Sequence, residues 1–235
     1  MGEEVPWHEV GENIVKKGLG TKHDIANWHR NVLHGALYLK ASKGDPECPC
    51  SICGEDRENW LHLWDCMAWR ASWNWFIELT NRVLPQQEGS TPPADASGAF
   101  VYLGLTTQGH VLPKSLDLLH KLIWKFAIQE FTNATVNGAP VREGEALTRA
   151  TRRFTTRVHS KLFQIRRKMG TEFPKGGHVP LDRFNKDLAP LGRAAKGTNS
   201  IDWHTDILPL LRWANAIEPR PEEEDERDAR EPGVT

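Results

Sequence analysis

The sequence predicts a mainly α-helical protein that is held together by a small cysteine-rich turn. Long stretches carry apolar residues at three- and four-residue spacing, which is the pattern of amphipathic helices. The four cysteines all lie within residues 48–66, and a single short segment has the composition of a strand. We therefore expect a stapled helical domain, irregular loops rich in proline and glycine, and a disordered acidic C-terminal tail.

Length and charge limit the classes of protein that fit. The 235 residues are enough for one large domain or two small ones. Thirty lysines and arginines against 31 acidic residues give a net charge of −1, which excludes a uniformly basic coat but not a local basic face. No apolar run approaches the ~20 residues of a membrane span, and no secretory signal is evident. We expect no membrane partner and an intracellular, reducing compartment, with nucleus and cytoplasm both open.

The first part of the chain is predicted to contain a polar arm followed by a helical domain over residues 23–84. Residues 1–22 are polar and interrupted by glycine, which is typical of a flexible arm. Residues 24–39 carry a helical apolar pattern that Asp24 can cap. The helical pattern resumes at residue 58 and continues to about residue 84, with a broad apolar face rich in tryptophan.

The second part is predicted to be a linker and then a helical region over residues 113–217. The linker covers residues 85–112 and includes a possible short strand at 99–105, for which no partner strand is evident. Pro113 opens a helix that ends between Asn133 and Gly138.

A further helix is predicted over residues 143–169 and is closed by Gly170. Residues 171–199 are rich in glycine and proline and are predicted to be irregular, and residues 207–216 form a last short helix. Residues 218–235 are acidic, without aromatic residues, and are predicted to be a disordered tail.

The cysteines have the spacing of a metal site. Two residues separate Cys50 from Cys53 in a tight turn, where Gly54 frees the backbone. His62 and Cys66 follow at i and i+4, a spacing that places both on one helix face. Three thiolates and one imidazole suit a tetrahedral zinc ion, with every position filled by the protein. A closed site of this kind stabilises a fold and performs no chemistry.

Three alternatives remain open at this point. The thiols can be free and buried, or they can form disulfides or take part in redox chemistry, although the nearby histidine favours a metal. Cys48 can replace Cys50 as the first ligand. His29 and His34 are more simply explained as ordinary helix residues.

The segment from Trp28 to Cys66, WHRNVLHGALYLKASKGDPECPCSICGEDRENWLHLWDC, resembles the zinc-binding domain that follows reverse transcriptase in non-LTR retrotransposons. The shared features are a helix with a W…LHG.L pattern, a C-x2-C-G turn, an acidic stretch and an H-L…C ending. In that family four residues usually separate the histidine from the last cysteine, whereas three do so here. The proline that follows the family's first cysteine follows Cys48 in this chain.

The resemblance implies specific ligands and a setting. It assigns Cys50, Cys53, His62 and Cys66 to the metal, and it assigns the preceding helix to Trp28, Leu33, His34, Gly35 and Leu37. No acidic pair or cluster typical of a polymerase, endonuclease or RNase H is present, so the resemblance implies a detached C-terminal piece or a host gene derived from one. It also implies a role near a reverse-transcription complex, in holding template RNA or placing the enzyme on target DNA.

One helix is unusually basic. Its cations are Arg149, Arg152, Arg153, Arg157, Lys161, Arg166, Arg167 and Lys168. They can neutralise phosphates and give salt-dependent binding to RNA or DNA, in which Arg is suited to bidentate contacts. A solvated helix face, or a surface for an acidic protein, is an alternative explanation.

The tryptophans Trp60, Trp64, Trp69, Trp73 and Trp75 can stack on unpaired bases, but their helical spacing favours core packing. No motif combines a nucleophile with a base, so we do not expect an enzyme or a small-molecule substrate.

The first hypothesis is a non-catalytic, zinc-stabilised protein that binds nucleic acid through the basic helix. The second is a structural or adaptor subunit of a larger protein assembly, whose zinc site is only a staple. A decayed reading frame that folds poorly is the third.

Overall fold

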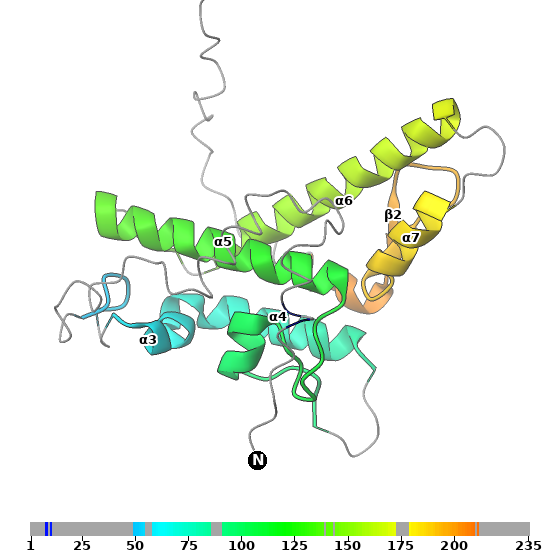
Figure 1. The fold of residues 1–235 in the computed structure, drawn as a ribbon. Helices are drawn as coiled ribbons and strands as arrows, with labels where there is room; N and C mark the ends of the chain where they lie inside the picture. Colours follow the sequence, from blue (N-terminus) through cyan, green and yellow to red (C-terminus); the bar gives the residue numbers. More distant parts are fainter. Residues whose placement is uncertain are drawn as a thin grey trace, which may run out of the picture.

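The computed structural model describes residues 8, 10, 49–54, 58–85, 91–138, 140–142, 144–172, 179–209 and 211. Across this part of the chain helices predominate, and one pair of short strands accompanies them (Figure 1). The predicted mainly helical class is therefore confirmed. The helix expected at residues 24–39 and the tail at 218–235 lie outside the described residues. Of the expected arm at 1–22, only His8 and Val10 are described; both are helical, and Val10 is buried.

The helix predicted over residues 58–84 is two helices. α3 runs over Trp60–Asp65 and α4 over Met67–Val83, and Cys66 lies between them with a non-helical backbone (φ −55°, ψ 128°). Asn59 caps α3, since its Oδ1 accepts a hydrogen bond of 2.9 Å from the His62 amide. Neither glycine nor proline interrupts residues 60–83. The sequence therefore gives no sign of this break.

The strand predicted at residues 99–105 is wrong, because Ala99–Leu103 form a single π-helical turn, η2. Phe100 and Val101 are fully buried. The Val101 carbonyl accepts two side-chain hydrogen bonds, each of 2.6 Å, from His120 Nε2 and Trp124 Nε1. Side chains of the following helix thus satisfy a carbonyl that a strand would have offered to a neighbouring strand.

Two long helices, α5 over Lys114–Asn137 and α6 over Glu145–Glu172, form the centre of the fold. Figure 1 shows α5 lying between α4 and α6, and α5 packs against both. The predicted limits of α5 are confirmed, since it follows Pro113 and ends at Gly138 with φ 63°. The predicted end of the next helix at Gly170 is wrong, because α6 continues to Glu172.

The core is continuous from Cys50 to Leu211 and draws on α4, η2, α5, α6 and α7. It therefore includes side chains from both predicted helical regions and from the predicted linker between them. The polar residues that interrupt α5 in the sequence are accommodated inside it. Lys121 is 1% exposed and donates a 2.7 Å hydrogen bond to Asp117.

The irregular segment predicted at residues 171–199 is also wrong. It contains α7, Val179–Leu188, and strand β1, Gly192–Ala194, which pairs antiparallel with β2, Ile201–Trp203, in the register Gly192 to Trp203. A Cβ on Gly192 would lie 2.5 Å from the Asp202 carbonyl oxygen, so the pairing needs glycine there. A short 3-10 helix, η3, follows at Thr205–Ile207. The last predicted helix, 207–216, is described only to residue 209 and at 211, and these residues are helical.

Within the described ranges, no helix combines the length and the apolar character that a bilayer crossing requires.

Candidate metal centre and basic helix face

Four side chains with metal-binding atoms converge where the turn at residues 50–54 meets α3 and α4. The three sulfurs of Cys50, Cys53 and Cys66 and a ring nitrogen of His62 all lie within 4.8 Å of one another. The Cys53 Sγ is 3.3 Å from His62 Nε2. The structure thus brings together the four residues that the spacing predicts as ligands.

Local backbone geometry presents the first two sulfurs. The Gly54 amide donates a 2.9 Å hydrogen bond to the Cys50 carbonyl, and Gly54 has φ 74°, which closes the turn. The Ile52 amide lies 3.5 Å from the Cys50 Sγ and points at it. Backbone amides directed at sulfur stabilise its thiolate form, which is the form that binds a metal.

The position of Cys66 differs from the predicted one. His62 lies in α3, whereas Cys66 ends α3 and precedes α4, so the two are not on one continuous helix. The break between the helices, and not the i, i+4 spacing alone, sets the position of the Cys66 sulfur beside the others.

The sequence analysis missed Glu58, which fixes the turn to the start of α3. Glu58 is 2% exposed, and its Oε2 accepts hydrogen bonds from the Ser51 amide, at 3.0 Å, and the Ser51 hydroxyl, at 2.6 Å. With the Asn59 cap, Glu58 orients the segments that carry Cys53 and His62. The Asn59 cap has a recognisable sequence signal, an asparagine before a helical run, whereas the contact of Glu58 with Ser51 has none.

The two most buried sulfurs share one environment. Cys50 is 4% exposed and Cys66 is 1% exposed. The hydrogen bond from the Cys66 thiol, together with the backbone amides, lowers the pKa of Cys50 to about 5. The same hydrogen bond and burial raise the pKa of Cys66. The shared hydrogen bond thus favours the thiolate form at Cys50 over Cys66, and a metal ion bound by both sulfurs would displace the proton of Cys66.

The donor set and its dimensions suit a tetrahedral metal ion. With Zn–S bonds of about 2.3 Å and Zn–N bonds of about 2.05 Å, tetrahedral angles put S and N about 3.6 Å apart and two sulfurs about 3.8 Å apart. The 3.3 Å between Cys53 Sγ and His62 Nε2 is close to the first value. The four atoms, within 4.8 Å of one another, need only a small contraction to reach the second. Three sulfurs and one nitrogen fill a tetrahedron and leave no position for a substrate.

The structure tests some of the alternatives to a metal site. Cys50, Cys53 and Cys66 are all free of disulfides. Cys48, the other candidate for the first ligand, lies outside the described residues, as do His29 and His34. Trp69, Trp73 and Trp75 are 2%, 3% and 4% exposed, so core packing is confirmed for these three.

Of the eight predicted basic residues of α6, four are half-buried and four are exposed. Arg149 and Arg166 contact other parts of the fold: the Arg149 guanidinium lies 4.7 Å from the centroid of the Phe126 ring, and Arg166 donates a hydrogen bond to the Ala195 carbonyl. Arg157 and Lys161 are half-buried. The remaining four are exposed: Arg152, Arg153, Arg167 and Lys168.

The four exposed cations belong to one face of α6, which we call the basic stripe. Its members, all exposed and spaced by one, three or four residues, are Arg152, Arg153, Thr156, Ser160, Phe163, Gln164, Arg167 and Lys168. At 1.5 Å per residue the stripe is about 24 Å long. Opposite it, Phe154, Val158 and Leu162 are fully buried, so the orientation of the stripe is set by the core. No family model, curated protein or solved structure matches the chain.

Proposed function

We propose that this chain is a non-catalytic, zinc-stabilised protein that binds RNA or DNA through the basic stripe of α6. The observation that carries the proposal is the charge of this helix. Eight cations lie between Arg149 and Lys168, and no acidic residue lies between Glu145 and Glu172. A helix face with four exposed cations and no nearby carboxylate on the same helix attracts phosphates.

The rigid seating of α6 supports this function. α6 packs along α5 and contacts α7, and its apolar side is buried from Ala146 to Ile165. The cations of the basic stripe therefore project from a fixed platform, which lowers the conformational entropy lost when phosphates bind.

The metal has a structural role in the proposal. Zn²⁺ would be held by Cys50, Cys53, His62 and Cys66, and it would supply a cross-link between the 50–54 turn and the α3–α4 junction. Because α4 packs on α5, and α5 on α6, this cross-link stabilises the platform from its far side.

The resemblance of residues 28–66 suggests the biological setting. The zinc-binding domains that this segment resembles follow a reverse transcriptase in non-LTR retrotransposons. In such a setting the chain would hold template RNA or place the enzyme on target DNA without performing chemistry itself.

The salt dependence of binding tests the proposal. Binding of fluorescent single-stranded and double-stranded RNA and DNA is measured by anisotropy between 50 and 300 mM salt. We expect affinity to fall steeply with salt, since each neutralised phosphate contributes about 0.7 to the logarithmic slope for single strands and about 0.9 for duplex DNA. The double variant Arg152→Ala/Arg153→Ala should reduce the single-strand slope by about 1.4.

The matched control removes two cations elsewhere. Arg70 and Arg82 are exposed on α4 and pair with Asp65 of α3 and Glu78 of α4, respectively. Their double alanine variant has the same net charge as the stripe variant and should bind with the wild-type slope. Equal slopes for the two double variants, or binding that does not depend on salt, would contradict the proposal.

The alternative function is a structural or adaptor subunit of a larger protein assembly. It is favoured by a net charge of −1 and by two exposed apolar side chains outside the stripe, Met67 at 52% and Val136 at 73%. Salt-insensitive binding to a protein partner, lost on substituting Met67 or Val136 with serine, would support this alternative.

A further inference from the structure

One aromatic side chain in the basic stripe does not contribute to the core. Phe163 is 52% exposed, whereas Phe154, on the same helix, is fully buried. Phe163 lies ten residues beyond Arg153 and four before Arg167, so cations flank it on both sides of the stripe. A single exposed apolar residue is common on protein surfaces, but an aromatic ring interleaved with cations is the composition of a site for single-stranded nucleic acid.

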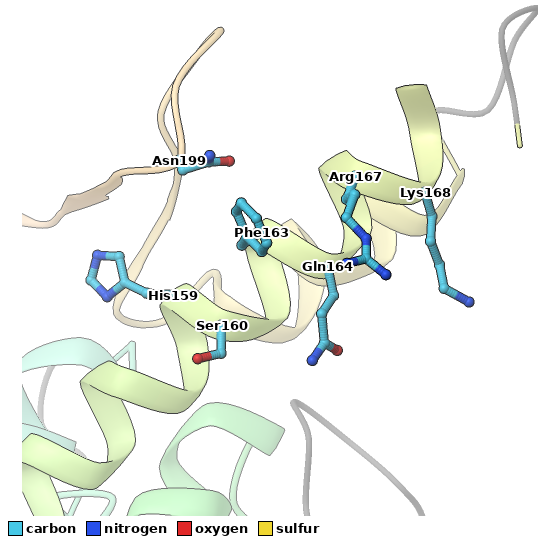
Figure 2. A pocket seen from close by; sticks show the side chains of 7 residues that line it. All are labelled: His159, Ser160, Phe163, Gln164, Arg167, Lys168 and Asn199. Atoms are coloured by element: carbon cyan, nitrogen blue, oxygen red, sulfur yellow. The ribbon is translucent and has the colours of Figure 1, made fainter. Parts of the chain in front are cut away.

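Phe163 lines an open hollow between α6 and the β1–β2 turn. The hollow measures about 630 Å³, within the range of sites for small groups, and Figure 2 shows the Phe163 ring on the side of α6 that faces Asn199. Its other lining residues are His159, Ser160, Gln164, Arg167 and Lys168. The lining thus combines one aromatic face, two cations and several short polar groups.

The wall opposite α6 is held in place. The Trp203 ring of β2 packs against the rings of Phe154 and His159, with centroids 6.2 and 6.4 Å away, and Arg166 donates a hydrogen bond to the Ala195 carbonyl at the end of β1. The β1–β2 turn that carries Asn199 is therefore tied to α6 on both strands. The hollow is formed before a ligand enters it.

The polar groups around Phe163 match the parts of a nucleotide. His159 Nδ1 donates to the Thr155 carbonyl at 2.9 Å, so Nε2 is the ring nitrogen that remains for a ligand. Asn199 is exposed and offers both an amide donor and a carbonyl acceptor, as base edges require. Arg167, about one helical turn beyond Phe163, is suited to the phosphate, and Lys168 follows it at the edge of the hollow.

We infer that the hollow holds one nucleotide of a single-stranded nucleic acid, with its base stacked on Phe163 and its phosphate on Arg167 and Lys168. The inference rests on the proposed function and adds a strand preference to it. A paired base cannot present its face to Phe163, because its neighbours in the duplex cover both faces. Cations with an interleaved aromatic group are the usual composition of single-strand sites, which tolerate many sequences.

The test compares strands with and without bases. Binding is measured for the wild type and for Phe163→Ala, with an oligonucleotide, an abasic strand of the same length and charge, and a duplex. We expect the wild type to prefer the base-bearing single strand, and Phe163→Ala to bind that strand about 5- to 100-fold more weakly, as for other stacking aromatics. Its affinity for the abasic strand and its salt slope should not change.

Three further variants separate the contribution of stacking from those of charge and of apolar volume. Phe163→Trp should restore the preference for bases, whereas Phe163→Leu, which retains apolar volume without an aromatic face, should not. The double variant Arg167→Ala/Lys168→Ala should reduce the salt dependence of binding for both the base-bearing and the abasic strand.

The outcomes distinguish this inference from the proposed function. If the wild type binds single strands in a salt-dependent way but Phe163→Ala binds the base-bearing strand equally well, the stacking site is wrong and the basic stripe stands. The stacking site is also wrong if Phe163→Ala keeps its affinity for nucleic acid and loses affinity for a protein partner instead. If the wild type binds no nucleic acid, both proposals fail.

Discussion

The metal centre and the basic stripe are built in opposite ways. At the metal centre four side chains from a short stretch of chain converge to within 4.8 Å, and two of them are almost completely buried. In the basic stripe the side chains extend along about 24 Å of one helix, and they are exposed. We expect the converging, buried groups to contribute to folding and the spread, exposed groups to contribute to binding. Variants in the two regions should therefore affect different measurements.

The largest effect is expected at the metal centre. Cys53→Ser removes one of four ligands, and we expect the free energy of unfolding to fall by about 5 kcal/mol or more, because loss of a structural metal is among the most destabilising changes. Circular dichroism melts with and without a chelator measure this. The chelator should destabilise the wild type and leave the stability of the variant unchanged. A wild type whose melt does not respond to the chelator would contradict a folding role for a bound metal.

A pair of phenylalanines on α6 tests the contrast within one helix. Phe154→Ala removes a fully buried ring and should destabilise the protein by about 3–5 kcal/mol. Phe163→Ala removes a ring that is 52% exposed and should change stability by about 0.5 kcal/mol or less. Denaturant unfolding of both variants is the measurement. Similar losses would mean that Phe163 is a core residue and not part of a binding face.

The pH dependence of stability tests the packing of α6 on α5 beneath the stripe. Glu130 of α5 is 7% exposed, and neither of its carboxylate oxygens has a hydrogen-bond partner among the described residues. Burial, followed by the charge of Glu145, raises its pKa from 4.5 to about 8, and Arg149 opposes the change.

The sign follows from proton linkage. The folded protein holds this proton more tightly than the unfolded chain, so its contribution to stability is complete below pH 4.5 and is lost as pH rises to about 8. We expect Glu130→Gln to be more stable than the wild type at pH 9, by an amount of the order of a few kcal/mol, and to differ little at pH 5. Urea unfolding at both pH values measures it. If the stability difference between Glu130→Gln and the wild type were the same at pH 5 and pH 9, the buried position of Glu130 would be contradicted.

A smaller effect than that of losing a ligand is expected for Glu58, which supports the candidate metal centre without being a ligand. Glu58→Ala leaves Ser51 without its acceptor and should cost about 1–3 kcal/mol and about 10- to 100-fold in metal affinity. Competition with a chromophoric chelator reports the affinity. Glu78→Ala, which removes an exposed carboxylate paired with Arg82, is the matched control and should retain wild-type affinity.

The two regions also differ in how far the sequence predicts them. Three of the four candidate metal ligands follow from local spacing, because Cys50 and Cys53 share one turn and His62 lies in the first turn of the next helix. The position of Cys66 depends on a helix break that the sequence does not signal. The exposed face of α6 could be identified only from the structure. Eight cations are visible in the sequence, but only the packing shows that Arg149 and Arg166 contact the fold while Phe163 does not contribute to the core.

The incorrect predictions have specific physical causes. The strand-like composition of residues 99–105 reflects burial, and side chains from α5, far along the chain, decide its conformation. The helix break at Cys66 has no breaker residue. The β1–β2 pairing depends on Gly192 lying against the Asp202 backbone, a contact between residues whose local sequence is typical of a loop.

The count of zinc ions per chain tests the central claim most directly, and Cys48 provides the control. Freshly purified wild type, Cys48→Ser and Cys50→Ser are compared by elemental analysis. The closed Cys50, Cys53, His62 and Cys66 site predicts one zinc in the wild type and in Cys48→Ser, and none in Cys50→Ser. A wild type without zinc, or zinc lost from Cys48→Ser and kept by Cys50→Ser, would contradict it.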